Sequence, residues 1–183
     1  EERITVDTTW TPLYGENNCI RDHYNQMVHQ YEKGSNGQGV VSEGYDKRKY
    51  YAMDIVVRAY NEGIAFRYHF PEVANNLFLH IKDEITSFRM PDGTMAWYEE
   101  WAQGPYIKRE LKMKNEGCEW FESERPLLLQ VPSGHYVALL EAQMKDYTRG
   151  KFRLKAENEL QVAMYDCADI ISPYNTPWRV VMV

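Results

Sequence analysis

Cysteine is scarce in this 183-residue chain, which contains only Cys19, Cys118 and Cys167. Their odd number and wide spacing fit neither a disulfide framework nor a zinc site. We therefore expect all three to be small residues of the core, which say little about the compartment in which the protein works.

Excess positive charge and long apolar runs are also lacking. The net charge is −6, and Lys47-Arg48-Lys49 is the only cationic run. Nucleic acid is excluded as a partner, because no basic stripe is present to release phosphate counterions. An anionic membrane surface is disfavoured on the same ground. No run approaches the ~20 apolar residues that a membrane-spanning helix needs, and the residues from Glu1 onward do not read as a signal peptide.

Aromatic residues, by contrast, are frequent at 14%, including 14 tyrosines and five tryptophans. This composition suits an all-β domain, whose pleated faces pack rings well, and it also suits a sugar-binding surface. Apolar residues make up 44% of the chain and charged residues 26%. These values predict one folded domain over residues 1–183 with a sizeable core.

The clearest local signal is a β-hairpin. Alternate residues from Met53 to Ala59 share one face, as do those from Ile64 to Phe70. Between them Asn61-Glu62-Gly63 supplies a short loop in which Gly63 is able to adopt a positive φ.

Short alternating runs elsewhere predict further strands and little helix. They cover residues 77–81, 86–90, 126–131, 136–142, 152–154, 160–164 and 178–183, with turns at 91–93 and 132–134. Residues 22–30 fit a strand better than a helix that begins at Asp22. Residues 32–45 are expected to form a flexible loop and 108–114 an extended edge. Together these runs predict an antiparallel β-sandwich.

Glu141 is the leading candidate for chemistry. In the predicted strand from Tyr136 to Ala142 it stands in phase with Val137 and Leu139. A carboxylate on an apolar face must be paired or bound to a metal, and calcium takes carboxylate oxygens. The alternative is a solvated strand end, because charged side chains are seldom buried.

Other acidic and aromatic residues are weaker candidates. The acids at 99, 100, 119, 122 and 124 are interpreted as facing water rather than as a glycosidase pair. Trp97 and Trp101, on either side of Tyr98, either stack on sugars or pack a loop against the sandwich. His135 lies too far along the strand from Glu141 for joint acid–base work. No dinucleotide, P-loop, metalloprotease or nucleophile-elbow motif occurs.

Five motifs occur in an order that is similar to one carbohydrate-enzyme family. They are Ile20-Arg-Asp-His-Tyr-Asn25, Arg58-Ala-Tyr-Asn-Glu-Gly-Ile-Ala-Phe-Arg-Tyr68, Glu84-Ile-Thr-Ser-Phe88, Leu140-Glu-Ala-Gln-Met-Lys-Asp-Tyr147 and Thr176-Pro-Trp-Arg-Val180. From about Trp10 to Val183 the chain resembles the N-terminal domain of glycoside hydrolase family 97.

The resemblance implies a β-super-sandwich of the galactose mutarotase type, followed in full-length members by a catalytic (β/α)8 barrel. Members are exo-acting bacterial α-glucosidases or α-galactosidases, usually exported to the periplasm. Both catalytic carboxylates sit on the barrel beside a calcium ion. One glutamate that ligates the calcium comes from the N-terminal domain, and its motif matches Leu140-Glu-Ala142, so the resemblance implies this role for Glu141.

We therefore expect a fragment that lacks the first strands of the family domain and the barrel, and that hydrolyses nothing alone. Its predicted role is a non-catalytic domain that packs on the barrel and provides Glu141 to calcium. The expected substrate is an oligosaccharide with α-linked glucose or galactose. One alternative is a free-standing lectin-like module that stacks sugars on Trp97 and Trp101. Another is a sugar-epimerising enzyme of the mutarotase type.

Overall fold

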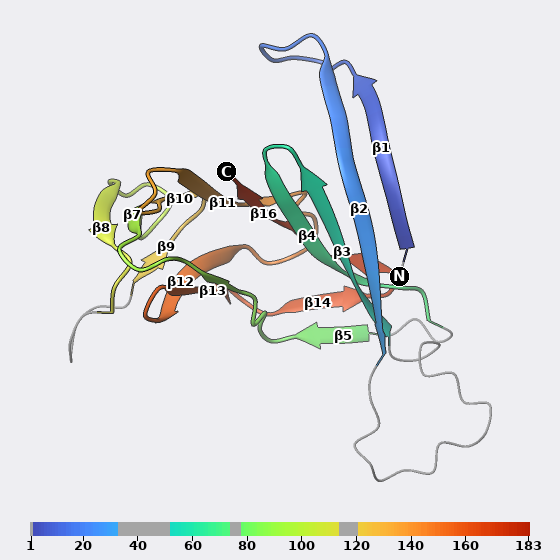
Figure 1. Cartoon of the computed structure of the whole chain (residues 1–183). Helices are drawn as coiled ribbons and strands as arrows, with labels where there is room; N and C mark the ends of the chain where they lie inside the picture. Colours follow the sequence, from blue (N-terminus) through green and yellow to red (C-terminus); the bar gives the residue numbers. More distant parts are fainter. Residues whose placement is uncertain (1, 33–51, 74–77, 114–120) are drawn as a thin grey trace. The chain divides into compact units, whose positions relative to one another are not determined.

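A computed structural model of the chain describes residues 2–32, 52–73, 78–113 and 121–183 (Figure 1). Within these ranges the protein contains sixteen strands and no helix. Every strand pair with a defined register is antiparallel. The predicted all-β, antiparallel class is confirmed. The described part of the chain also holds no helix that is apolar and long enough to span a membrane.

The chain forms two compact units, of which unit 1 comprises Glu1–Leu77 and Ile171–Thr176. Four of its strands form a meander in which each is hydrogen-bonded to the next, and a fifth, β15, pairs with β4. They are β1 (Glu2–Trp10), β2 (Ile20–Glu32), β3 (Ala52–Tyr60), β4 (Gly63–Phe70) and β15 (Tyr174–Asn175). Residues 22–30 are thus strand, as predicted, and β1 and β2 form a long two-stranded ribbon in Figure 1.

The predicted hairpin is confirmed as β3 and β4. Its register pairs Val57 with Phe66 and Tyr60 with Gly63, so the turn itself is Asn61-Glu62. Gly63 has a φ of 149°, in the positive range that favours glycine. In β3 the face that carries the alternating apolar residues Met53, Ile55 and Val57 is only half-buried. The opposite face, which carries Asp54 and Val56, is buried.

Unit 2 comprises Phe78–Ile170 and Pro177–Val183. One sheet runs in the order β8 (Ile107–Glu110), β7 (Met95–Tyr98), β10 (Leu127–Gln130), β11 (Tyr136–Ala142) and β16 (Trp178–Met182). A second sheet runs in the order β6 (Ser87–Arg89), β13 (Glu159–Met164), β12 (Gly150–Ala156) and β9 (Glu122–Ser123). A separate pair joins β14 (Ala168–Ile171) to β5 (Phe78–Ile81).

The core of unit 2 is formed by the inner faces of its two larger sheets. Leu129 and Leu139 on one sheet and Leu160 and Val162 on the other belong to a single buried cluster. Two antiparallel sheets that bury a shared apolar layer make a β-sandwich. The division into two units does not test the prediction of one domain over residues 1–183, which stays a prediction.

The predictions for the cysteines and for two segments outside the main strands had different outcomes. Cys19 and Cys167 are exposed free thiols, so their assignment to the core is wrong. Cys118 and almost all of the predicted 32–45 loop lie outside the described residues. The predicted extended edge at 108–114 corresponds in part to β8, Ile107–Glu110, which lies at the edge of its sheet.

Candidate functional site

The side chain of Glu141 points into unit 2 from the end of β11. It lies on the same face as Leu139, which is fully buried, and only 3% of the Glu141 side chain is exposed. The prediction that this carboxylate shares the apolar face is confirmed, and the alternative of a solvated strand end is wrong. Burial of a carboxylate is costly unless partners compensate its charge.

Two arginines and one backbone amide provide that compensation. Arg179, opposite Glu141 in the β11–β16 register, donates from Nη1 to Glu141 Oε1. Arg125 Nε forms an ion pair with Oε2. The Gly150 amide donates to Oε1 at 3.1 Å and lies 3.3 Å from Oε2. Both oxygens of Glu141 are therefore engaged.

Gly150 allows this close approach because it has no side chain. A Cβ at this position would lie 2.9 Å from Glu141 Oε1 and 3.1 Å from Val162 Cγ1. Gly150 begins β12, so the strand fixes its amide, and the missing side chain leaves room for the carboxylate.

Arg179 is the centre of the cluster. Its Nε and Nη2 donate to the two oxygens of Glu84 at 2.8 and 2.5 Å, a bidentate fork, and its side chain is 1% exposed. Thr86 Oγ1 also donates to Glu84 Oε1 at 2.8 Å. Burial alone lowers the pKa of Arg179, but hydrogen bonding to Glu84 and the charges of Glu84 and Glu141 raise it above its ordinary value. The guanidinium is therefore held in its charged form.

Arg125 extends the cluster to a third buried carboxylate. Its Nη1 donates to Glu124 Oε2 at 3.3 Å and to the Gly150 carbonyl at 3.1 Å. Glu124 Oε1 also lies 3.3 Å from Lys151 Nζ and 3.5 Å from Arg149 Nη2. The interpretation that the acids of this region face water is wrong for Glu124 and for Glu99, which are both buried.

The cluster joins three motifs that are far apart in the sequence. Glu84, Glu141 and Arg179 come from the third, fourth and fifth of the motifs described above, one residue from each. Sequence reasoning singled out Glu141 and missed the other two. For Arg179 a signal was present: it stands in phase with Val181, which packs on the core, so a charge on that face needed a partner.

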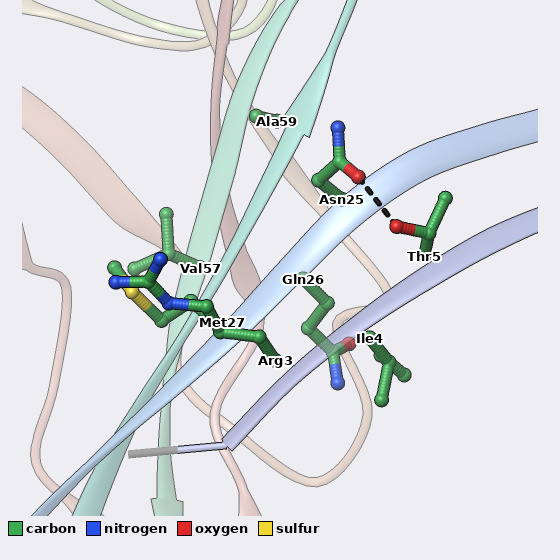
Figure 2. Close-up of a pocket in the computed structure, with 8 residues that line it drawn as sticks. All are labelled: Arg3, Ile4, Thr5, Asn25, Gln26, Met27, Val57 and Ala59. Atoms are coloured by element: carbon green, nitrogen blue, oxygen red, sulfur yellow. Dashed lines mark hydrogen bonds between the residues drawn. The ribbon is translucent and has the colours of Figure 1, made fainter.

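A groove of about 560 Å³ in unit 1 is separate from this cluster (Figure 2). It lies on the face of β1, β2 and β3 where Arg3, Met27 and Val57 are neighbours in register. Thr5 Oγ1 donates to Asn25 Oδ1 at 2.8 Å within it. None of the site residues predicted from the sequence lines this groove, whose walls are Arg3, Ile4, Thr5, Asn25, Gln26, Met27, Val57 and Ala59.

Comparison with known proteins gives the same family as the five motifs. The family model described as glycosyl-hydrolase 97 N-terminal matches residues 1–183. The chain belongs to glycoside hydrolase family 97, as its N-terminal domain. The match covers the whole chain, including the residues of the buried cluster.

Solved structures show that the fold is that of the family 97 N-terminal β-sandwich. A family 97 enzyme from Pseudoalteromonas sp. strain K8, solved with acarbose, matches with a TM-score of 0.80 at 19% identity. The alignment covers 99% of this chain and 26% of the enzyme. A variant of that enzyme, solved with panose, gives the same values. A β-arabinopyranosidase matches with a TM-score of 0.77 at 17% identity, over 100% of this chain and 31% of that one. The chain thus spans about a quarter to a third of the length of these enzymes.

In the described part of the family 97 domain, the neighbours of Glu141 include the cationic side chains of Arg125 and Arg179. Calcium takes six to eight oxygen ligands, and the described ranges contain no group of three or more acidic, histidine or cysteine side chains able to hold a metal. Both oxygens of Glu141 face arginines. The cluster as a whole places three carboxylates among four cations, which repels a further cation. A calcium role for Glu141 stays a prediction.

The two predicted sugar-stacking residues differ in their surroundings. The Trp97 ring has Lys108 Nζ 4.4 Å from its centroid and the Tyr136 ring at 5.9 Å. Trp101 follows β7 in a turn that the Gly104 amide closes on the Trp101 carbonyl, and it is 56% exposed. Tyr98, between them, is buried against Phe121. Stacking of sugars on Trp97 and Trp101 stays a prediction.

Proposed function

We propose that this chain is the non-catalytic N-terminal domain of an exo-acting α-glycosidase. The observation that carries the proposal is the match of the family 97 N-terminal model over residues 1–183. The chain corresponds to about a quarter of a family 97 enzyme solved with acarbose and, as a variant, with panose. Oligosaccharides with α-linked glucose or galactose are therefore the proposed substrates of the longer polypeptide.

The buried cluster supports the non-catalytic part of this proposal. Glycoside hydrolysis uses two carboxylic groups that reach the sugar from opposite sides of the scissile bond. Glu84, Glu124 and Glu141 are all buried in ion pairs with arginine or lysine. A carboxylate held in this way braces the fold and is poorly placed to protonate or attack a substrate.

The proposed longer polypeptide is exported to the periplasm and carries a catalytic barrel on which this domain packs. Glu141 is its proposed contribution to a calcium ion beside the barrel carboxylates. The support is the match of Leu140-Glu-Ala142 to the family motif. When bound, calcium would orient the substrate and assist proton transfer at the barrel carboxylates.

Hydrolysis assays test the proposed function directly. The longer polypeptide that carries this chain should hydrolyse p-nitrophenyl α-glucoside or α-galactoside, and the 183-residue chain alone should hydrolyse neither. Hydrolysis by the chain alone, or activity of the longer polypeptide on neither substrate, would contradict the proposal.

The exposed ring of Trp101 favours one alternative, a free-standing sugar-binding module. That alternative predicts measurable affinity of the 183-residue chain for maltooligosaccharides by calorimetry, with loss of binding in Trp101→Ala. We expect no binding by either form of the isolated chain. Binding that depends on Trp101 would favour the module over the α-glycosidase domain.

A further inference from the structure

We propose that β1 is a docking edge for a second copy of this chain, and that the two β1 strands pair antiparallel about a two-fold axis at Thr5. The proposal does not depend on the proposed function, because it concerns the edge of unit 1 and no residue of the buried cluster. A two-fold contact of this kind uses the same strand in both copies.

The β1 edge of unit 1 is long and regular. Among the described strands, β1 ends the sheet order and is hydrogen-bonded to β2 alone (Figure 1). Its nine residues pair with β2 without a register shift from Glu2 to Trp10, and eight of them are exposed. Proline and bulges are two devices that blunt such edges, and β1 contains neither. Its outer row of backbone groups is therefore a template on which another strand can be added.

The charges of β1 favour a partner strand of the same sequence. Side chains alternate along a strand, so Arg3, Thr5 and Asp7 lie on one face. In an antiparallel pair centred on Thr5 of both copies, Arg3 of each copy lies directly opposite Asp7 of the other. Opposite charges in directly opposed positions stabilise a strand pair, and like charges destabilise it. A pair centred on Asp7 would oppose the two aspartates, and one centred on Val6 would contain no charge pair on this face.

The other face of β1 adds apolar contacts in the same register. Ile4 is 51% exposed and would lie opposite Val6 of the second copy, and the symmetry repeats this pair. Two β-branched side chains of this kind pack well on a pleated surface. Arg3, Ile4 and Thr5 also line the groove of Figure 2, so the grooves of the two copies would meet at the axis.

Asp7 is already held in position for this contact. Arg21 Nε and Nη2 donate to its two carboxylate oxygens, each at 2.7 Å. Hydrogen bonding from Arg21 lowers the pKa of Asp7 below its ordinary value, so the carboxylate is charged. Each carboxylate oxygen can accept a further hydrogen bond. A guanidinium from the second copy therefore meets an ordered carboxylate, which reduces the entropy lost on association.

Sedimentation velocity of the 183-residue chain over a series of concentrations tests the proposal. One strand pair is a small interface, so we expect a reversible equilibrium between monomer and dimer. Arg3→Asp places two carboxylates opposite each other at both charge pairs and should weaken dimerisation at least tenfold. The matched control is Arg89→Asp, which makes the same change on β6, an exposed edge strand of unit 2. This control should dimerise like the wild type.

A mixture of two variants tests the register itself. Asp7→Arg opposes two guanidinium groups at both pairs, so it should also dimerise at least tenfold more weakly than the wild type. Mixed with Arg3→Asp, it should form a heterodimer of nearly wild-type affinity, because each pair again joins a cation to a carboxylate. Arg3 and Asp7 are both exposed, and circular dichroism should show that both variants are folded.

Three results would overturn the proposal. They are a chain that is monomeric at every concentration, dimerisation of Arg3→Asp equal to that of the wild type, and a mixture of the two variants that does not recover the dimer. The longer polypeptide tests the other occupant of the edge. If it stays monomeric where the 183-residue chain dimerises, a strand of its own chain covers β1, and the second copy is overturned as the occupant.

Discussion

Replacement of Arg179 by methionine should destabilise the protein by about 3–5 kcal/mol, because it leaves two buried carboxylates without their shared cation. Glu84 and Glu141 have 5% and 3% of their side chains exposed, so water cannot replace the guanidinium. A loss of this size is a large fraction of the total stability of a typical domain. Urea unfolding followed by circular dichroism measures it.

Two comparisons separate the role of charge from that of shape. Arg179→Lys keeps the charge but loses the fork that binds both oxygens of Glu84, so its loss of stability should be intermediate. Arg153→Met breaks the exposed pair with Glu122 and should cost less than about 1 kcal/mol. An Arg179→Met chain no less stable than Arg153→Met would show that the cluster does not brace the fold.

Gly150→Ala should cost about 1–3 kcal/mol, since the new methyl group overpacks a site that has no room for it. Its Cβ would lie 2.9 Å from Glu141 Oε1, so the carboxylate would have to move away from its arginine partners. Gly150 is not among the residues with positive φ, so the cost comes from this contact and not from backbone strain. Chemical unfolding measures it.

A double-mutant cycle locates the cause of that cost. When Glu141→Ala is already present, the oxygen that the new Cβ meets is gone, and Gly150→Ala should cost less than in the wild type. Additive losses in the double variant would assign the cost to the 3.1 Å contact with Val162 instead. Wild-type stability of Gly150→Ala would contradict the close packing altogether.

Local patterns in the sequence predicted most of the strands. The hairpin of β3 and β4 could be predicted because alternation and a turn glycine act over neighbouring residues. Alternation alone did not indicate which face is buried. In β3 the apolar residues Ile55 and Val57 are half-buried, while Asp54 is buried on the other face. Burial depends on which elements cover a face, and that is a property of the whole fold.

The candidate site was predictable only in part. Side chains alternate between the two faces of a β-strand, so Glu141 shares the inward face of Leu139 in β11, and this direction was predicted. Its partners were not, because Glu84 and Arg125 come from segments 57 and 16 residues before Glu141 along the chain, a separation at which periodicity carries no information. The resemblance to family 97 marked the motifs of Glu84 and Arg179 without showing that their side chains meet.

The exposed cysteines and buried acids were missed for a related reason. Residue type gives an average tendency to be buried, and Cys167 and Glu124 both depart from it. Glu124 is buried because Arg125, Arg149 and Lys151 surround it with positive charge. Such compensation is visible only once the strands that carry these residues are in place.

The most direct test of a role for Glu141 in the enzyme is the activity of Glu141→Gln in the longer polypeptide, beside the matched variant Glu122→Gln. Glu122 pairs with Arg153 on the exposed side of unit 2, so its replacement should leave kcat/KM for p-nitrophenyl α-glycosides near the wild-type value. We expect Glu141→Gln to lower kcat/KM at least tenfold and to weaken calcium binding, while circular dichroism shows a folded protein. Equal activity of the two variants would contradict a role for this domain's buried glutamate in the enzyme.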